Sequence, residues 1–157
     1  MEERYNMNIL LVDDEPEYRM LMGHFLEGEG NTVFIAEHGE DALKKLDDAP
    51  MDIIISDVYM PVMDGLKFHK TVRANPKYEK LPFLFVSGFD DQYTLSAVKE
   101  SKFDGFIRKA RPMSELKEWI KYLTTPIDKR PLTPPGESTR RADRDRERDR
   151  SLRSNRS

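Results

Sequence analysis

Side chains that can act as nucleophile, metal ligand or charge partner follow short apolar runs at four places in this sequence. A carboxylate ends the run of isoleucines in MDIIISDVYMPVMDG, and the other three runs are followed by an acid pair, a hydroxyl and an amine. These residues are Asp57, the pair Asp13 and Asp14, Ser87, and Lys109. A carboxylate in such a position can be a nucleophile, bind a metal ion, or only cap a turn, so its partners decide the chemistry.

Each of the four apolar runs is predicted to be a β-strand. Ile53–Ile55 is a short, continuous run of β-branched residues, which is typical of a strand buried on both faces of a parallel sheet. Pro61 and the pair Asp64-Gly65 indicate a loop before the next helix. Asp57 is therefore expected at the carboxyl end of its strand, where ligands bind in open α/β sheets.

Strand-like and helix-like patterns alternate five times along the chain. Strands are predicted at 9–12, 32–36, 53–56, 81–86 and 104–107. Helices are predicted from Pro16, from Gly39, after Gly65 as far as Asn75, at 91–100 and at 113–123. This alternation predicts an α/β fold, a (βα)5 doubly wound parallel sheet with right-handed crossovers.

The sequence resembles a response-regulator receiver domain, the phosphoacceptor half of a two-component signalling system. The resemblance covers roughly residues 8–123, and it rests on the acid pair at 13–14, SDVYMPVMDG at 56–65, VSG at 86–88 and Lys109 at a strand end. It implies a flavodoxin-like strand order, 2-1-3-4-5, which brings the carboxyl ends of strands 1, 3, 4 and 5 together.

The resemblance implies that Asp57 is the phosphoacceptor and that Mg²⁺ binds beside it. Asp14 is then a direct metal ligand, Asp13 acts partly through water, and Asp57 and the backbone carbonyl of Tyr59 complete the ligand set. Oxygen ligands suit Mg²⁺, and three crowded carboxylates repel one another without a cation.

The resemblance also assigns roles to residues on the last two strands. Lys109 pairs with the phosphoryl oxygens, and Ser87 donates a hydrogen bond to one of them. When Ser87 moves toward the phosphate, Phe106 turns inward, and this changes the face formed by the fourth helix, fifth strand and fifth helix. Tyr59 and Phe89 flank the path of the hydrolytic water, and neither carries a group that could orient it, so slow dephosphorylation is expected.

One position departs from the family pattern. The family usually has a cis proline directly after the lysine, but here Ala110 follows Lys109. A cis bond before alanine costs about 2.5–4 kcal/mol. Either the fold supports that cost, or the loop takes a trans route and places Lys109 slightly differently.

Composition divides the chain into two parts. Residues 8–124 are expected to form the receiver domain, and residues 125–157 a Pro-rich linker followed by an Arg/Asp/Glu-rich disordered tail. The net charge of -3 combines +4 from residue 126 onward with -7 before it. There is no cysteine, no apolar stretch of membrane-spanning length and no signal-peptide pattern, so a cytoplasmic protein is expected.

We therefore expect a stand-alone phosphoacceptor regulator rather than an enzyme. A histidine kinase or phosphotransfer protein is the upstream partner, an unidentified protein is the downstream target, and no DNA-binding domain or membrane segment is expected. The alternative is a phosphorylation-independent interaction module that keeps the fold. A nucleotide hydrolase or an autonomous phosphatase is disfavoured because no Gly-rich phosphate loop or second nucleophile appears.

Overall fold

The computed structural model describes residues 6–136, and within them five strands alternate with five α-helices. The strands are β1 (Asn8–Val12), β2 (Thr32–Ala36), β3 (Ile53–Asp57), β4 (Phe83–Ser87) and β5 (Asp104–Arg108). The helices are α1 (Pro16–Gly28), α2 (Gly39–Asp48), α3 (Gly65–Ala74), α4 (Gln92–Lys99) and α5 (Met113–Thr124). Two short 3-10 helices, η1 (Pro76–Tyr78) and η2 (Ile127–Lys129), follow α3 and α5.

All five strands are parallel, in the order β2-β1-β3-β4-β5. This confirms the predicted flavodoxin-like sheet. The chain places β2 on one side of β1 and β3 on the other, so the order reverses between β1 and β3. The carboxyl ends of these two strands therefore flank the switch point where ligands bind in such sheets.

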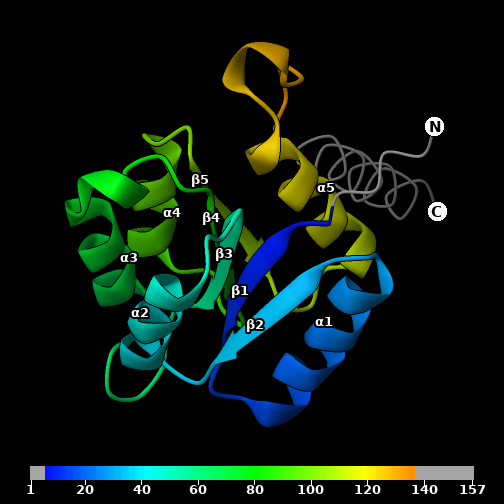
Figure 1. Cartoon of the computed structure of the whole chain (residues 1–157). Coiled ribbons are helices and arrows are strands. Elements are labelled where there is room, and N and C mark those ends of the chain that lie inside the picture. Colours follow the sequence, from blue (N-terminus) through cyan, green and yellow to red (C-terminus); the bar gives the residue numbers. More distant parts are fainter. Residues whose placement is uncertain (1–5, 137–157) are drawn as a thin grey trace, which may run out of the picture.

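Helices cover both faces of the sheet: α1 and α5 lie on one face, and α2, α3 and α4 on the other (Figure 1). Strand β3 shows why both faces need covering. Ile55 packs with Met22 and Ile120 in one core cluster, and Ile54 packs with Phe68 in the other. Its apolar run is continuous because its side chains are buried on both sides.

Element boundaries differ from the sequence predictions by one or two residues. Strand β4 begins at Phe83 instead of residue 81, because Pro82 has no N–H to donate to a ladder, although its carbonyl accepts from the Ile54 amide at 2.9 Å. Helix α4 begins after Asp91, whose side chain accepts from the Tyr93 amide at 3.0 Å and caps the helix.

The chain turns at η2 after α5, and Pro131, Leu132, Pro134 and Pro135 line one groove together with α4, β5 and α5. The sequence predicted an extended Pro-rich linker here. The predicted Arg/Asp/Glu-rich tail falls in residues 137–157, which lie outside the described residues.

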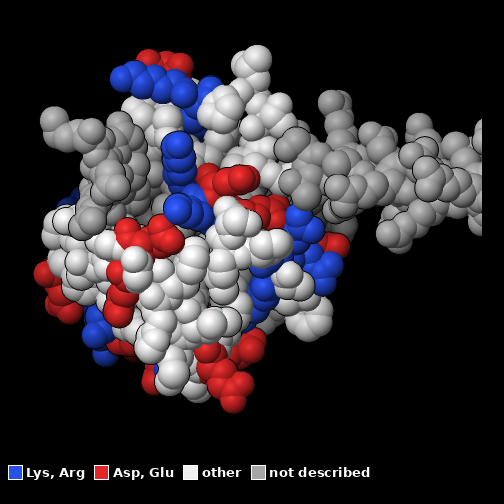
Figure 2. Space-filling model, turned by 90° about the vertical axis from the view of Figure 1, so that its right-hand side faces the viewer, with Lys and Arg blue, Asp and Glu red and all other residues white. Residues whose placement is uncertain are grey.

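Charges of both signs are mixed on the face shown in Figure 2, which is the α1 and α5 side of Figure 1. Among the coloured residues, Lys and Arg are interspersed with Asp and Glu between larger uncharged areas. A continuous basic surface is what binding to a polyanion requires, and this face does not present one outside its grey atoms. Within residues 6–136, no helix has the length and apolar character needed to cross a lipid bilayer.

Candidate functional site

Asp57 is the last residue of β3, at the carboxyl end of the sheet. Its side chain is 7% exposed, and its Oδ1 accepts a hydrogen bond from the Val58 amide at 2.7 Å. The loop after it folds back so closely that a Cβ on Gly65 would collide with the Asp57 carbonyl oxygen. Gly65 also donates its amide to the Val58 carbonyl at 2.7 Å. Close approach of α3 therefore requires glycine at this position and fixes the backbone around Asp57.

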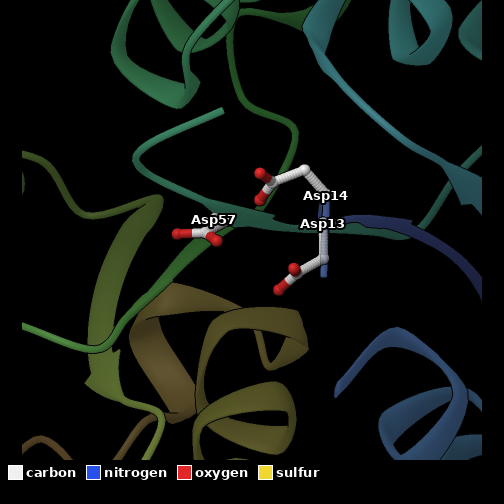
Figure 3. A group of neighbouring side chains, drawn as sticks. All are labelled: Asp13, Asp14 and Asp57. Carbon is white, nitrogen blue, oxygen red and sulfur yellow. The ribbon is translucent and has the colours of Figure 1, made fainter. Parts of the chain in front are cut away.

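The acid pair that follows β1 faces Asp57. Oxygens from Asp13, Asp14 and Asp57 all lie within 4.8 Å of one another, and the three side chains converge on one space (Figure 3). Asp13 and Asp57 are buried, whereas Asp14 is exposed. Asp13 Oδ1 accepts from the Glu15 amide at 2.8 Å, which orients its carboxylate. The carboxylates predicted from sequence are thus brought together.

Lys109 supplies the cation of this cluster. Its Nζ lies 3.0 Å from Asp13 Oδ2 and 3.0 Å from Asp57 Oδ2. It also lies 2.9 Å from Glu15 Oε1 and 4.5 Å from the ring centroid of Tyr18. Sequence reasoning missed Glu15 and Tyr18 as partners of the lysine. The position of Glu15 directly after the acid pair is the one signal that could have indicated it.

The backbone route after β5 is trans. Every peptide bond in residues 6–136 is trans, so the bond between Lys109 and Ala110 takes the second of the two routes considered above. The Lys109 amide donates to the Ser87 carbonyl at 2.8 Å, which continues the pairing of β5 with β4. This bond places Lys109 at the site without a cis peptide.

Burial and the charges of neighbouring groups shift the pKa values of Asp13, Asp57 and Lys109. Burial raises the pKa of Asp57 and of Asp13 above the ordinary value, although hydrogen bonds and the charge of Lys109 oppose the shift. Burial by itself would lower the pKa of Lys109, but hydrogen bonds to Glu15, Asp13 and Asp57 outweigh it and raise that pKa. The lysine is therefore held charged, while the two buried carboxylates lack enough positive charge around them.

Ser87 and Phe106 are both buried. Ser87 ends β4, one residue beyond Val86, which pairs with Asp57. Its Oγ accepts from the Phe89 amide at 3.2 Å. Phe106 on β5 is 4% exposed and packs in the core cluster on the α2, α3 and α4 face. The sheet register thus brings Ser87 to the same edge as Asp57, with the Phe106 ring in an inward position.

Tyr59 and Phe89 form an aromatic pair at the rim of the site. Their ring centroids are 6.3 Å apart in an edge-on arrangement, and the side chains are 56% and 68% exposed. The Tyr59 hydroxyl donates to Asp91 Oδ2 at 2.9 Å, which ties the loop after β3 to the start of α4. The two rings are therefore held together while remaining open to solvent.

The acid cluster fits a divalent cation. Three carboxylates, two of them buried, offer oxygens within 4.8 Å of one another. Hard oxygen ligands are what Mg²⁺ prefers, and the raised pKa values of Asp13 and Asp57 indicate that both would gain from added positive charge.

Residues 9–121 match the family model of the response regulator receiver domain. The chain is 35% identical over 109 residues to an uncharacterized 14.6 kDa protein from Leptolyngbya boryana, covering 69% of this chain and 83% of that one. It is 32% identical over 117 residues to response regulator RR06 of Streptococcus pneumoniae, covering 74% of this chain and 52% of that protein. The chain thus spans about half the length of the latter relative.

Solved structures agree with this match. Chemotaxis protein CheY4 of Vibrio cholerae superposes with a TM-score of 0.69 at 32% identity, covering 74% of this chain and 98% of that one. Response regulator TrrA of Thermotoga maritima, solved in complex with Mg²⁺-BeF, superposes with a TM-score of 0.65 at 32% identity, with the same coverage, 74% and 98%. The parallel five-stranded sheet in the order β2-β1-β3-β4-β5 is a flavodoxin-like fold. The family match over residues 9–121 shows that this chain belongs to the response regulator receiver domain family.

Proposed function

We propose that this chain is a signalling phosphoacceptor in which Asp57 receives a phosphoryl group from a histidine kinase or phosphotransfer protein. The observation that carries the proposal is the position of Lys109, whose Nζ lies 3.0 Å from both Asp57 and Asp13. A lysine held against a buried nucleophile is placed to balance the charge that an incoming phosphoryl group brings. We assign this activity to residues 8–124.

In the proposed reaction an oxygen of Asp57 attacks the phosphorus of a phosphohistidine. The new O–P bond forms as the P–N bond breaks, and the electron pair of the broken bond stays with the donor imidazole. Lys109 Nζ exchanges its contact with Asp57 Oδ2 for one with a phosphoryl oxygen. A Mg²⁺ ion held by Asp13, Asp14, Asp57 and the Tyr59 backbone carbonyl would reduce the repulsion between carboxylate and phosphoryl group. The Thermotoga maritima relative was solved in complex with Mg²⁺-BeF, which supports magnesium binding in this family.

Ser87 and Phe106 are then proposed to change position in response to the phosphoryl group. The Ser87 hydroxyl, which now accepts from the Phe89 amide, is the proposed donor to a phosphoryl oxygen. Phe106 lacks a hydroxyl, so its response depends on packing alone. A shift of Ser87 changes the space beside Phe106 and alters the α4–β5–α5 face, to which a downstream protein binds.

The phosphorylated state is proposed to be long-lived. Tyr59 and Phe89 stand at the rim of the site, and neither side chain offers a carboxylate or amide that could orient a water against the phosphorus. Removal of the phosphoryl group then depends on a partner.

Intact-mass measurement with a small phosphodonor and Mg²⁺ tests the proposal. The wild-type chain should gain the mass of one phosphoryl group, and Asp57→Asn should gain none. Asp47→Asn is a matched control, because Asp47 is exposed in the last turn of α2, which leads to the amino end of β3, whereas Asp57 lies at the carboxyl end of that strand. Chelation of Mg²⁺ should abolish the gain. An unchanged mass for the wild-type chain with Mg²⁺ bound would favour the phosphorylation-independent interaction module instead.

A further inference from the structure

Arg130 fastens the chain beside the end of α5. Its guanidinium donates to the backbone carbonyls of Thr125 at 2.9 Å and Leu123 at 3.1 Å, and to the carbonyl of Lys102 just before β5. The same group lies 5.0 Å from the ring centroid of Tyr122. One half-buried side chain therefore holds the turn at η2 against both α5 and the approach to β5.

Gly136 makes a second attachment at the other end of α5. It is buried, has a φ of +86°, and lies so close to Glu115 that a Cβ would collide with the carboxylate. Glu115 is in the first turn of α5 and pairs with Arg111. A side chain at Gly136 is disfavoured by its left-handed backbone conformation and would also displace the Glu115 carboxylate.

Residues 131–136, which we name the strap, lie between these two attachments. Pro131, Leu132, Pro134 and Pro135 line a groove of about 530 Å³ together with α4, β5 and α5. The groove also contains the large apolar side chains Leu95, Val98, Phe106, Trp119 and Tyr122. The strap thus forms one wall of a groove whose other walls belong to the face proposed above to bind a downstream protein.

The strap runs back along α5. Glu115, Trp119 and Tyr122 are spaced four and three residues apart and share one side of the helix. From Glu115 to the end of α5 is about 14 Å at the helical rise, and from Pro131 to Gly136 an extended polyproline-type chain spans about 15 Å. These lengths agree with a strap that begins beside the last turn of α5 and ends beside the first.

We propose that the α4–β5–α5 face is a binding site for an extended proline-rich segment and that the strap is the resident occupant of this face, where it closes one side of the groove. A downstream partner must displace the strap to reach the groove. Prolines suit this role because their restricted φ leaves little chain entropy to lose on binding.

The strap is held weakly enough to be displaced. Leu132 borders the groove but is fully exposed, and its neighbours Pro131 and Thr133 are exposed too, so the middle of the strap buries little apolar surface. A tethered segment has an effective concentration on the order of millimolar, so a weak contact is enough to keep the groove occupied. Loss of either attachment should therefore open it.

Phosphorylation can act on the strap through Phe106, and this coupling rests on the proposed function of Asp57. Phe106 lines the strap groove. It pairs with Phe85 of β4, which lies two residues before the buried Ser87. A change in the packing of Phe106 alters the floor of the groove. Phosphorylation is thus expected to release the strap.

The single tryptophan of the chain, Trp119, reports on the strap directly, because it lies in the groove. Quenching of its fluorescence by acrylamide should increase at least ~2-fold in Gly136→Ala, which disturbs one attachment, and in Arg130→Ala, which removes the other. Gly28→Ala is the matched control, because a Cβ there meets nothing within 4 Å. It should quench as the wild-type chain does. Far-UV circular dichroism identifies any variant that does not fold.

A synthetic peptide of residues 126–136, added at millimolar concentration, should restore low quenching to folded Gly136→Ala, and a scrambled peptide should not. Equal quenching in the wild-type chain and both folded variants would overturn the proposal. So would restoration by the scrambled peptide, since the groove would then have no preference for this segment.

The coupling is measured in the same chain by adding phosphodonor and Mg²⁺. Quenching of the wild-type chain should rise toward that of Gly136→Ala, and Asp57→Asn should not respond. Intact mass separates the two proposals. A gain of one phosphoryl group without a change in quenching would overturn the coupling alone, whereas no gain in mass would overturn the phosphoacceptor function and leave the variant and peptide results to decide on the strap.

Discussion

At the scale of single residues, one amine, that of Lys109, contacts the carboxylates of Asp13, Glu15 and Asp57. Sequence patterns indicated Asp57, Asp13 and Lys109, because each follows an apolar run whose strand end could be predicted. They did not indicate Tyr18, which the structure places under the Lys109 ammonium. Its helical spacing with other apolar residues of α1 is equally typical of a core side chain, and only the packing of α1 against the site decides between the two.

The lifetime of the phosphorylated state depends on individual side chains at the rim. Tyr59→Asn and Phe89→Glu each introduce a group that can orient a water, so each should accelerate phosphoryl decay by up to about tenfold, or about 1.4 kcal/mol of barrier. Decay is followed by intact mass after removal of the phosphodonor.

Tyr93→Asn serves as the control for that measurement. Tyr93 is an aromatic residue of α4 with 82% of its surface exposed, and its replacement should leave the decay rate unchanged. Equal rates in all four chains would show that the two rim residues do not limit access of water.

At the scale of elements, the sequence predicted the alternation and the resemblance predicted the strand order, and both are confirmed. Continuous apolar runs mark buried parallel strands, and they made β1, β3 and β4 recognisable. What pattern analysis could not supply is how elements are tied together by polar side chains. Asp104 of β5 is an example, because its partners lie on α3, more than thirty residues earlier.

Asp104 ties β5 to α3. Its buried carboxylate accepts from Arg73 at 2.6 Å and lies 3.0 Å from His69 Nε2. Burial by itself would raise the pKa of Asp104, but the hydrogen bond to His69 and the charges of His69 and Arg73 outweigh it and lower that pKa. The folded-state pKa therefore lies below the unfolded one, so this carboxylate stabilises the fold above about pH 4.

Asp104→Asn should lower the free energy of unfolding by about 3 kcal/mol at pH 7, because it leaves the half-buried Arg73 guanidinium without its counter-charge. The deficit relative to the wild-type chain should shrink as the pH falls below about 4, where Asp104 itself becomes protonated. Urea unfolding at several pH values measures it, with Asp47→Asn as control. A deficit that is the same at pH 3 and pH 7 would contradict this account.

At the scale of the whole molecule, composition predicts a domain followed by a Pro-rich linker, but it carries no information on where residues 131–135 are placed. Prolines between 126 and 135 are typical of an extended linker, and residues 131–135 are in fact placed along the α4–β5–α5 groove. Arg130 determines this placement, because it donates hydrogen bonds to three backbone carbonyls. These carbonyls, of Lys102 and of the end of α5, are brought together only by the tertiary fold. No local pattern carries that information.

Two truncations separate the contribution of Arg130 from that of the strap. A chain that ends at Arg130 loses the strap and residues 137–157 but keeps η2 and the bonds to the carbonyls of Thr125, Leu123 and Lys102. Its free energy of unfolding should stay within about 1 kcal/mol of the full chain, because the strap buries little apolar surface. A chain that ends at Thr125 also loses these hydrogen bonds and should be less stable by about 2 kcal/mol.

Urea unfolding of the two truncated chains beside the full chain measures the difference, and intact mass after phosphodonor treatment should show equal phosphorylation in all three. If the chain ending at Arg130 were as unstable as the one ending at Thr125, the strap would carry the stability and could not be a weakly held occupant. If it were stable, opening the groove would cost little of the folding free energy, which is the condition under which binding of a partner can compete with the strap.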